Sequence, residues 1–451
     1  MGGGLLQLVA YGAQDAYISG NPQITFWKGL FKRHTNFAME PFRINFSGQV
    51  QWGTKQTALV GRHADLLYST YVEVVLPKKT ADGVDYYWNN DQSALGYNLI
   101  KYVELDVGGQ IIDRLYSEFM YLWGKLTSES IQFSKLTDLL SGPTNSIGPA
   151  LLENDAGCAS DGRQRKMNVI YIPLPFFFTR NPGAALPLIA LQYHEVKINV
   201  LWNETQFIAG NFTSSTVAET INSISVNLPP IQDLPQAIQA ALYIDYIYLD
   251  TEERRRMAQA SHEYLIEQTQ FNEDKGIRGA NNRIDLTFNH PVKELIWVVQ
   301  PAAYTDCRIA AQAGDNRLQP FTYTTDPVFE QWLQINGQDR LDRRYGDYFS
   351  KVQPYQHHSG SLIVGLNADG SAFTVGGAYM YSFALRPEEH QPSGTCNFSR
   401  IDTATIVMNM AGGNTFGPTA DDGGDWNVRV YAVNYNVLRV MSGMGGLAYS
   451  N

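Results

Sequence analysis

The segment Leu105-Asp106-Val107-Gly108-Gly109-Gln110 returns, 228 positions later, as Leu333-Gln334-Ile335-Asn336-Gly337-Gln338. Each copy reads as the end of a β-strand followed by a turn. Gly109 and Gly337 take equivalent places in these turns, where small residues are favoured. We therefore expect two strand-end turns at equivalent places in two related halves of the chain.

Three further pairs of segments repeat in the same order along the chain. Each pair alone is a weak match between strand-like segments, but a shared order with a shrinking shift is hard to obtain by chance. The pairs are Phe37–Glu40 with Tyr264–Glu267, Pro187 with Pro392, and Asp245–Leu249 with Asn434–Leu438. The sequence thus predicts an internal duplication.

Most apolar segments are short or alternate with polar residues, a pattern typical of β-strands. The strands predicted in this way are 66–76, 99–107, 167–173, 195–202, 241–249, 283–288, 294–299, 379–385 and 428–440. Two short helices are expected, one after the possible cap Asn21 and one over Glu252–Met257 with Thr251 as its cap. The fold class is therefore all-β with short connecting helices.

The duplication divides the chain into four parts. We predict an N-terminal arm (1–35), a first domain (36–250), a connector (251–261) and a second domain (262–451). Long loops rich in Gly, Asn, Ser and Asp separate the strands, and these loops favour a sandwich of two four-stranded sheets, the jelly roll. Two consecutive jelly-roll β-sandwich domains form a double jelly roll. Two loops are expected to project outward, 203–239 and 301–327.

Composition excludes several classes of protein. The 451 residues include 34 Lys and Arg against 44 Asp and Glu, a net charge of -10, which argues against direct contact with nucleic acid. The cysteines Cys158, Cys307 and Cys396 are odd in number and widely spaced, so neither a disulfide framework nor a zinc pair is expected. No run of 18 apolar residues is present, and we expect a soluble chain.

No catalytic or cofactor motif is found, so the chain is predicted not to be an enzyme and to need no cofactor. His357-His358 is the one histidine pair, but adjacent residues on a strand face opposite sides and cannot share one metal. We interpret it as an ordinary exposed pair. The acidic loop Asp421–Asp425 lacks the spacing of an EF-hand, and we interpret it as a solvated turn.

Two further sets of residues have alternative interpretations. Arg254, Arg255 and Arg256 follow Glu252-Glu253, so they form either a salt-bridged connector helix or a subunit contact. The acceptor pattern for glycosylation occurs at Asn203, Asn211 and Asn397. Without a secretory signal, these triplets are more simply explained as accidents of sequence.

Ten segments distributed from one end of the chain to the other are distinctive. They are Gln7–Asp15, Gly20–Phe26, Thr35–Phe37, Leu186–Glu195, Asp245–Asp250, His262–Gln268, Asn336–Arg340, Gln391–Arg400, Asn434–Arg439 and Met441–Tyr449. Together these segments resemble the major capsid proteins of the large nucleocytoplasmic DNA viruses, and the algal-virus branch most closely.

The resemblance implies a structural protein with a double jelly-roll fold. Homotrimers of such a chain would present six similar sides, forming pseudo-hexagonal capsomers that tile the icosahedral shell of a large double-stranded DNA virus. The implied partners are the chain itself, neighbouring capsomers, minor capsid and penton proteins, and an inner viral membrane, without direct nucleic acid. The implied location is the virion capsid, with synthesis and assembly in the host cytoplasm. The alternative is a jelly-roll carbohydrate-binding protein or a cupin-like metalloenzyme.

The predicted arm ends in a cluster of apolar and basic residues. These are Phe26, Trp27, Lys28, Leu30, Phe31, Lys32 and Arg33. On a helix capped by Asn21 they would lie close together, which suits docking on minor capsid proteins or on an anionic inner membrane. In the alternative interpretation, the aromatic residues fill the base of the first jelly roll.

Overall fold

The computed structural model of the protein describes residues 3–27, 29, 31–76, 87–88, 94–141, 169–205, 209–210, 217–221, 224–228, 237–277, 281–301, 327–362, 364–366, 372–374, 376–410 and 426–449. The chain separates into two compact units, 1–37 and 38–451. The first unit is a short arm, and the second contains all of the extended sheets.

The arm contains two helices, α1 (Gly3–Val9) and α2 (Ala13–Ser19). The Asp15 side chain accepts a hydrogen bond from the Gly12 backbone N–H at the start of α2. The helix predicted after Asn21 is wrong. Asn21 has a left-handed φ of 50°, whereas a capping residue takes an extended backbone, and the described residues from 22 to 27 are not helical.

The first sandwich consists of two sheets. One sheet has the strand order β1-β14-β4-β8 and the other has the order β3-β10-β6-β7. Their bounds are β1 (Phe37–Asn45), β14 (Ala237–Leu249), β4 (Leu66–Val75), β8 (Val169–Pro173), β3 (Lys55–Leu59), β10 (Val196–Trp202), β6 (Ile100–Val107) and β7 (Gln110–Tyr116).

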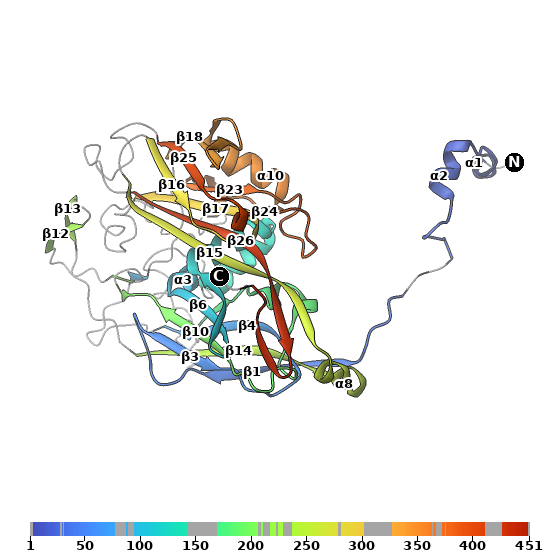
Figure 1. Ribbon diagram of the computed structural model, residues 1–451, viewed down its shortest axis with the longest axis horizontal. Coiled ribbons are helices and arrows are strands. Elements are labelled where there is room, and N and C mark those ends of the chain that lie inside the picture. Colours follow the sequence, from blue (N-terminus) through green and yellow to red (C-terminus); the bar gives the residue numbers. More distant parts are fainter. Residues whose placement is uncertain are drawn as a thin grey trace, which may run out of the picture. The chain divides into compact units, whose positions relative to one another are not determined.

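The second sandwich repeats this order as β15-β26-β17-β23 and β16-β25-β18-β19. Its strands are β15 (His262–Ile277), β26 (Trp426–Met441), β17 (Pro291–Pro301), β23 (Ala378–Ser382), β16 (Asn281–Leu286), β25 (Ala404–Met410), β18 (Val328–Ile335) and β19 (Gln338–Asp339). In both sandwiches the first strand pairs with the last, as in a jelly roll. The predicted double jelly roll is therefore confirmed, and Figure 1 shows the two sandwiches one above the other.

Shorter strands extend these sheets or form separate hairpins. They are β2 (Val50–Gln51), β5 (Tyr87–Trp88), β9 (Leu186–Pro187), β11 (Ala209–Gly210), β12 (Val217–Ile221), β13 (Ile224–Leu228), β20 (Arg344–Tyr345), β21 (Val364–Leu366), β22 (Ala372–Thr374), β24 (Cys396–Asn397) and β27 (Met444–Leu447). Strand β9 pairs with β4, and β24 pairs with β17 at the equivalent place in the second sandwich.

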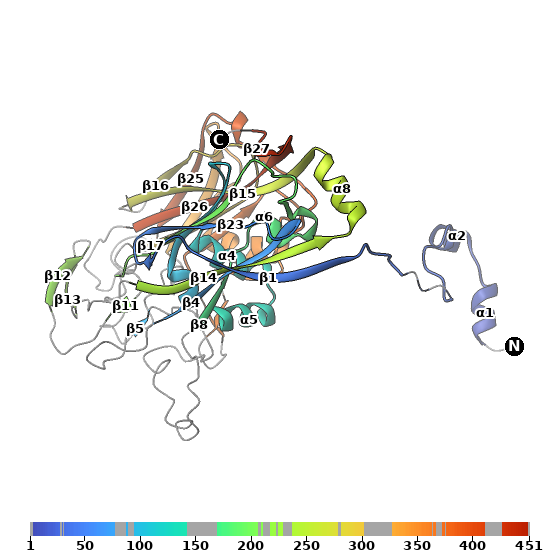
Figure 2. The same ribbon diagram turned by 90° about the horizontal axis from the view of Figure 1, so that it is seen from below.

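The helices are more substantial than the predicted connectors. They are α3 (Leu95–Asn98), α4 (Ser117–Thr127), α5 (Ser130–Ser141), α6 (Phe177–Arg180), α8 (Thr251–Gln259) and α10 (Gln353–His357), with the short turns η3 (Pro182–Ala184), η5 (Tyr348–Val352) and η6 (Phe398–Arg400). Helix α8 joins β14 to β15 (Figure 2), as predicted, but its cap is Asp250, whose side chain accepts from the Thr251 backbone N–H. Helices α4 and α5 were not predicted.

The repeated six-residue segment forms the same turn in both sandwiches. Gly108 and Gly109 have φ values of 63° and 88° between β6 and β7, and Asn336 and Gly337 have 50° and 77° between β18 and β19. Two consecutive left-handed residues are what a tight hairpin requires, because this backbone twist matches that of the paired strands. The predicted equivalence of Gly109 and Gly337 is confirmed.

One hydrophobic core crosses between the sandwiches. The strands β17 and β26 are buried on both faces. Val430 and Ala432 point into the second sandwich, whereas Tyr431 and Val433 belong to the core of the first. This two-sided burial explains why the two strands read as almost continuous apolar runs.

We predict that Gly109→Val and Gly337→Val each lower the free energy of unfolding by about 1–2 kcal/mol, since a β-branched residue is strained at positive φ. No atom lies within 4 Å of a Cβ placed at either position, so the cost comes from the backbone alone. Urea denaturation checks this. The control Gly337→Asn should cost clearly less, because asparagine tolerates this region; an equal cost would contradict the backbone explanation.

Candidate functional site

The contact surface between the two sandwiches, which we call the seam, is built by α4, α6 and β7 of the first sandwich against β15, β17 and β26 of the second. Aromatic rings form part of it. The Tyr116 ring stacks on Phe271 with centroids 4.4 Å apart, and Phe119 lies 5.7 Å from Tyr431. These rings exclude water from the polar groups around them, which strengthens every charge interaction in the seam.

A buried ion pair joins α4 to β26. Two nitrogens of the Arg429 guanidinium, Nε and Nη2, each donate to the Glu118 carboxylate at 2.7 Å, and the Tyr431 hydroxyl donates to it at 2.7 Å. Arg429 also donates to Gln300 of β17 at 2.6 Å. Burial alone would lower the pKa of Arg429, but Glu118 outweighs it and raises the pKa. The bidentate geometry stabilises the charged form of Arg429.

A second charge group joins α6 to β15 and β17. The Glu267 carboxylate accepts from Arg180 at 2.8 Å and from Lys293 at 2.7 Å. Burial would raise the pKa of Glu267, but the two cations outweigh it and lower the pKa. Lys293 has no exposed side-chain surface and also lies over the Trp123 ring of α4, 5.2 Å from its centroid. The lysine is thus held by carboxylate and aromatic partners from both sandwiches.

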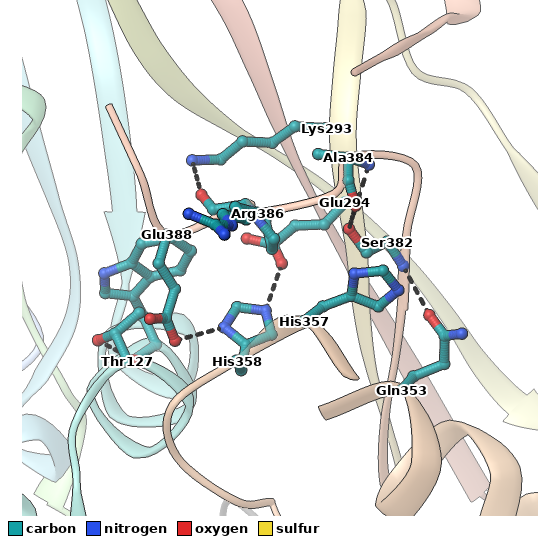
Figure 3. Close-up of polar contacts among 12 residues, drawn as sticks. Thr127, Lys293, Glu294, Gln353, His357, His358, Ser382, Ala384, Arg386 and Glu388 are labelled. Atoms are coloured by element: carbon teal, nitrogen blue, oxygen red, sulfur yellow. Dashed lines mark hydrogen bonds and ion pairs between the residues drawn. The ribbon is translucent and has the colours of Figure 1, made fainter. Parts of the chain in front are cut away.

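His358 forms the third charge group, shown in Figure 3. Its Nε2 lies 2.8 Å from Glu294 and its Nδ1 lies 2.9 Å from Glu388. Burial would lower the pKa of His358, but the two carboxylates raise it to about 9. The imidazole is therefore protonated at neutral pH and donates from both nitrogens.

The interpretation of His357-His358 as an exposed pair is wrong for His358, whose side chain is fully buried. The pair does not lie on a strand. His357 ends α10 and His358 follows it, so the chain turns and carries the second imidazole inward. Directly after it, the Ser359 hydroxyl donates to the Thr127 carbonyl and the Gly360 backbone N–H to the Leu126 carbonyl, which ties this turn to the end of α4.

Asp113 of β7 is the remaining buried acid of the seam. Its carboxylate accepts from the backbone N–H of Thr269 in β15 at 3.0 Å and from that of Arg114 at 2.9 Å. Burial raises its pKa to about 6, although the Thr269 hydrogen bond and Arg180 work in the opposite direction.

These charges balance one another. Four carboxylates, Glu118, Glu267, Glu294 and Glu388, face four cations, Arg180, Lys293, His358 and Arg429. Of these residues only His358 was considered from the sequence, and it was interpreted as exposed. A signal was present in Lys293-Glu294, a charged pair that opens an apolar strand and must find partners when that strand is buried.

The aromatic residues of the arm are exposed within their own unit. The rings of Phe26 and Trp27 form an edge-to-face pair with centroids 5.5 Å apart. Phe26 and Phe31 are each 94% exposed, and Trp27 is 90% exposed. Lys32 and Arg33 are exposed as well, whereas Lys28 and Leu30 lie outside the described residues.

The arginine triplet lies on α8, as predicted. Arg254 pairs with Asp65 of the first sandwich at 3.0 Å, an intrachain contact. Arg255 and Arg256 are exposed on α8.

Two of the three glycosylation candidates can be located. Asn203 is half-buried, and its amide donates to the Asn98 carbonyl at 3.2 Å. Asn397 is exposed and caps η6 by accepting from the Ser399 backbone N–H. Asn211 lies outside the described residues, as do the acidic loop 421–425 and most of the loops 203–239 and 301–327.

Within the described part of the chain, no group of three or more His, Cys, Asp or Glu side chains is placed to hold a metal ion. The same residues include no helix that is both long and apolar enough to span a bilayer.

Two family models match the chain. Residues 25–250 match the model described as major capsid protein N-terminus, and residues 253–446 match the model of the large eukaryotic DNA virus major capsid protein. The chain belongs to this family. Its role is that of a structural capsid protein, and the alternative of a lectin or cupin-like enzyme is not supported.

The chain matches curated relatives over their full lengths. The major capsid proteins of Pyramimonas orientalis virus, Phaeocystis pouchetii virus and Paramecium bursaria Chlorella virus 1 are 44%, 40% and 38% identical, and each comparison covers all of both chains. The predicted resemblance to algal-virus capsid proteins is confirmed.

Solved structures agree with the fold. The chain is similar to the quasi-atomic model of the PBCV-1 virus capsid, with a TM-score of 0.74 and 33% identity over 95% of this chain and 100% of that one. The Faustovirus major capsid protein shares the fold with a TM-score of 0.68 at 12% identity, covering 96% of this chain and 94% of that one.

We predict that this capsid protein loses stability at alkaline pH, because His358 then loses its proton. Its folded pKa of about 9 lies above the ordinary value of 6.5, so its contribution is complete below pH 6.5 and disappears as the pH rises through 9. The loss should be about 3 kcal/mol of unfolding free energy between pH 6.5 and 10. Chemical denaturation at several pH values should show this loss in the wild type and a smaller slope in His358→Gln; equal slopes would contradict it.

We predict that Glu118→Gln costs about 3–5 kcal/mol, because it leaves the buried Arg429 without its counter-charge. The double variant Glu118→Gln/Arg429→Met should cost less than the sum of the single variants. The exposed pair Arg439–Glu263 joins β26 to β15 and serves as the control, with an expected cost below about 1 kcal/mol for Glu263→Gln. Similar costs at the two pairs in urea denaturation would refute a stabilising role for the seam charges.

Proposed function

We propose that the chain forms homotrimers that act as pseudo-hexagonal capsomers and tile the icosahedral shell of a large double-stranded DNA virus. The observation that supports this is the repetition of one strand order in two sandwiches joined through a buried seam. Three such chains present six similar sides, and a nearly hexagonal unit packs without gaps in a flat facet. Formation of a shell depends on large complementary surfaces, so no catalytic role and no cofactor is needed.

The four-part division gives each part a role in this proposal. The sandwiches 36–250 and 262–451 form the wall of the capsomer, the connector 251–261 joins them, and the arm 1–35 lies on the inner side of the shell. The exposed Phe26, Trp27 and Phe31 beside Lys32 and Arg33 support a docking role for the arm. Its partners are minor capsid proteins or an anionic inner membrane, since apolar and basic groups together suit both.

Other partners contact the outer surfaces. Neighbouring capsomers and penton proteins meet the sides of the trimer, and the exposed Arg255 and Arg256 are candidates for such contacts. The outward loops 203–239 and 301–327 carry any host contacts. Of the glycan candidates, Asn397 is exposed, whereas the Asn203 amide is engaged in a hydrogen bond. The net charge of -10 supports the absence of direct nucleic-acid contacts, and assembly takes place in the host cytoplasm.

We predict a trimer in solution. Multi-angle light scattering of the purified chain should give about three times 50.5 kDa without added metal or sugar. A monomer that persists at high protein concentration and physiological salt would contradict the proposal.

We predict that the triple variant Lys28→Glu/Lys32→Glu/Arg33→Glu still forms trimers but fails to assemble onto the inner layer of the shell. The sandwich cores are unchanged, whereas the charge of the arm is reversed. Particle yield, compared with trimer yield on gel filtration, measures this. Normal particle yield would eliminate the electrostatic docking role and leave only the filling of the jelly-roll base.

A further inference from the structure

The seam shows how one sandwich of this fold covers another. The outer face of the sheet β15-β26-β17-β23 is covered by the strand β7 and the helix α4 that follows it. Helix α4 is buried on nearly all sides for this reason, since one side packs on its own sandwich and the other on the neighbouring sheet. In the first sandwich, β7 follows the repeated turn and leads into α4. In the second sandwich, β19 and β20 follow the equivalent turn and lead into the helical segment η5 and α10.

The equivalent sheet face of the first sandwich lacks such a cover among the described residues. On β4, β14 and β8 the side chains of Tyr71, Tyr243 and Tyr171 lie together. Tyr71 and Tyr243 stack at 5.2 Å, and Tyr171 lies 6.0 Å from Tyr71 and is 39% exposed. Glu73 of β4 and Asp245 of β14 lie close enough to Tyr71 to act on its hydroxyl group. We call these five residues the tyrosine face.

The tyrosine face is acidic as well as aromatic. Burial, Asp245, Tyr243 and Glu73 together raise the pKa of Tyr71, which agrees with carboxylates that lie close to the ring hydroxyl. Helix α8 covers only another part of this sheet, where Met257 packs near Ile247. A surface with stacked tyrosines and carboxylates suits a partner that carries aromatic and arginine side chains.

The same chain carries a segment of that kind. After β19 and β20 the second sandwich enters η5 and α10, as the first enters α4 after β7. The inner side of this segment packs through Phe349 on Trp297. The segment exposes Arg344 and Tyr345 on β20 as well as Val352 and Tyr355 on η5 and α10, and Tyr355 is 88% exposed. We call these four residues the counterpart of α4.

We propose that the counterpart of α4 in one copy of the chain covers the tyrosine face of a second copy. Two independent observations support this occupant. The internal duplication relates the two surfaces to the pair that is already joined in the seam, and the arginine of the counterpart complements the carboxylates of the face. The proposal rests on the homotrimer of the proposed function and names the surfaces that form it.

The proposed contact has a consequence for symmetry. It joins two different surfaces, so each copy has one donor and one acceptor side, and such a head-to-tail contact closes a ring. Within the ring, chain-internal seams alternate with contacts between copies. A pair of copies related by a two-fold axis would require the same patch on both sides and is not what this geometry predicts.

Two variants test the proposal on the full-length chain. The first, Val352→Asp/Tyr355→Asp, places carboxylates on the counterpart, where they would face the acidic tyrosine face. The second, Glu73→Arg/Tyr171→Ala, changes the tyrosine face and sets its charge against Arg344. Each should weaken association at least about 30-fold, as expected for loss of a central interface residue, and each alone should be a monomer by light scattering. The substituted side chains are exposed or half-exposed, so circular dichroism and the urea midpoint should remain those of the wild type.

Mixing the two variants gives the decisive result. The first variant keeps an intact tyrosine face and the second keeps an intact counterpart, so together they form one contact and should give dimers of about twice 50.5 kDa, without trimers. The control Tyr449→Ala removes a tyrosine that is 62% exposed and lies outside both surfaces, and it should leave the trimer unchanged.

The outcomes separate this proposal from the proposed function. If the wild type is a trimer and both variants remain trimers, the assignment of these surfaces is overturned while the capsomer stands. If both variants are folded monomers but their mixture gives no dimer at high concentration, the two surfaces do not pair with each other. A wild type that is itself monomeric would overturn the proposed trimer.

Discussion

The removal of the seam charges from water is the constraint on which the rest of the structure depends. A buried charge without a partner costs several kcal/mol, and two of these carboxylates take a cation from the other sandwich, Glu118 from Arg429 and Glu267 from Arg180. Each sandwich therefore completes the other, and the second unit behaves as one body although it holds two repeats of one fold. Burial of ion pairs adds little net stability compared with apolar packing, but it allows only one relative placement of the two sandwiches.

The fold could be predicted from the sequence because its signals are local and repeated. Each predicted strand overlaps an observed one, and the turn residues Gly109 and Gly337 marked equivalent hairpins. Strands such as β15 and β18 were not predicted as strands by periodicity, although parts of them appeared in the repeated pairs. The sequence predicted β26 as a strand from its long apolar run. It could not show that the strand is buried on both faces, because the residues that cover its second face belong to the first sandwich.

The site was less predictable, and the reasons are physical. Helix α4 has no readable polar face, because both sides are buried, so its 3.6-residue period is hidden. His358 looked like half of an exposed pair, since nothing in its neighbours along the chain announces Glu294 or Glu388. Arg254 found its partner Asp65 across 189 positions. Pairings between distant residues follow from the packing of whole sheets and are not encoded in the spacing of charges.

The strand β27 and the turn before it reach back to the first sandwich. The Tyr193 backbone N–H donates to the Gly443 carbonyl, His194 Nδ1 lies 2.9 Å from the Gly445 carbonyl, and the Leu447 backbone N–H donates to Gln110. A ribosome must therefore release residues 443–447 before the first sandwich gains all of its contacts, although its own strands are made much earlier. Translation that stops before this stretch yields a chain that still carries every charged pair of the seam but lacks these hydrogen bonds between β27 and the first sandwich. Such a chain presents a less firmly fixed pair of surfaces to its neighbours, so only a fully translated subunit has its complete set of internal links.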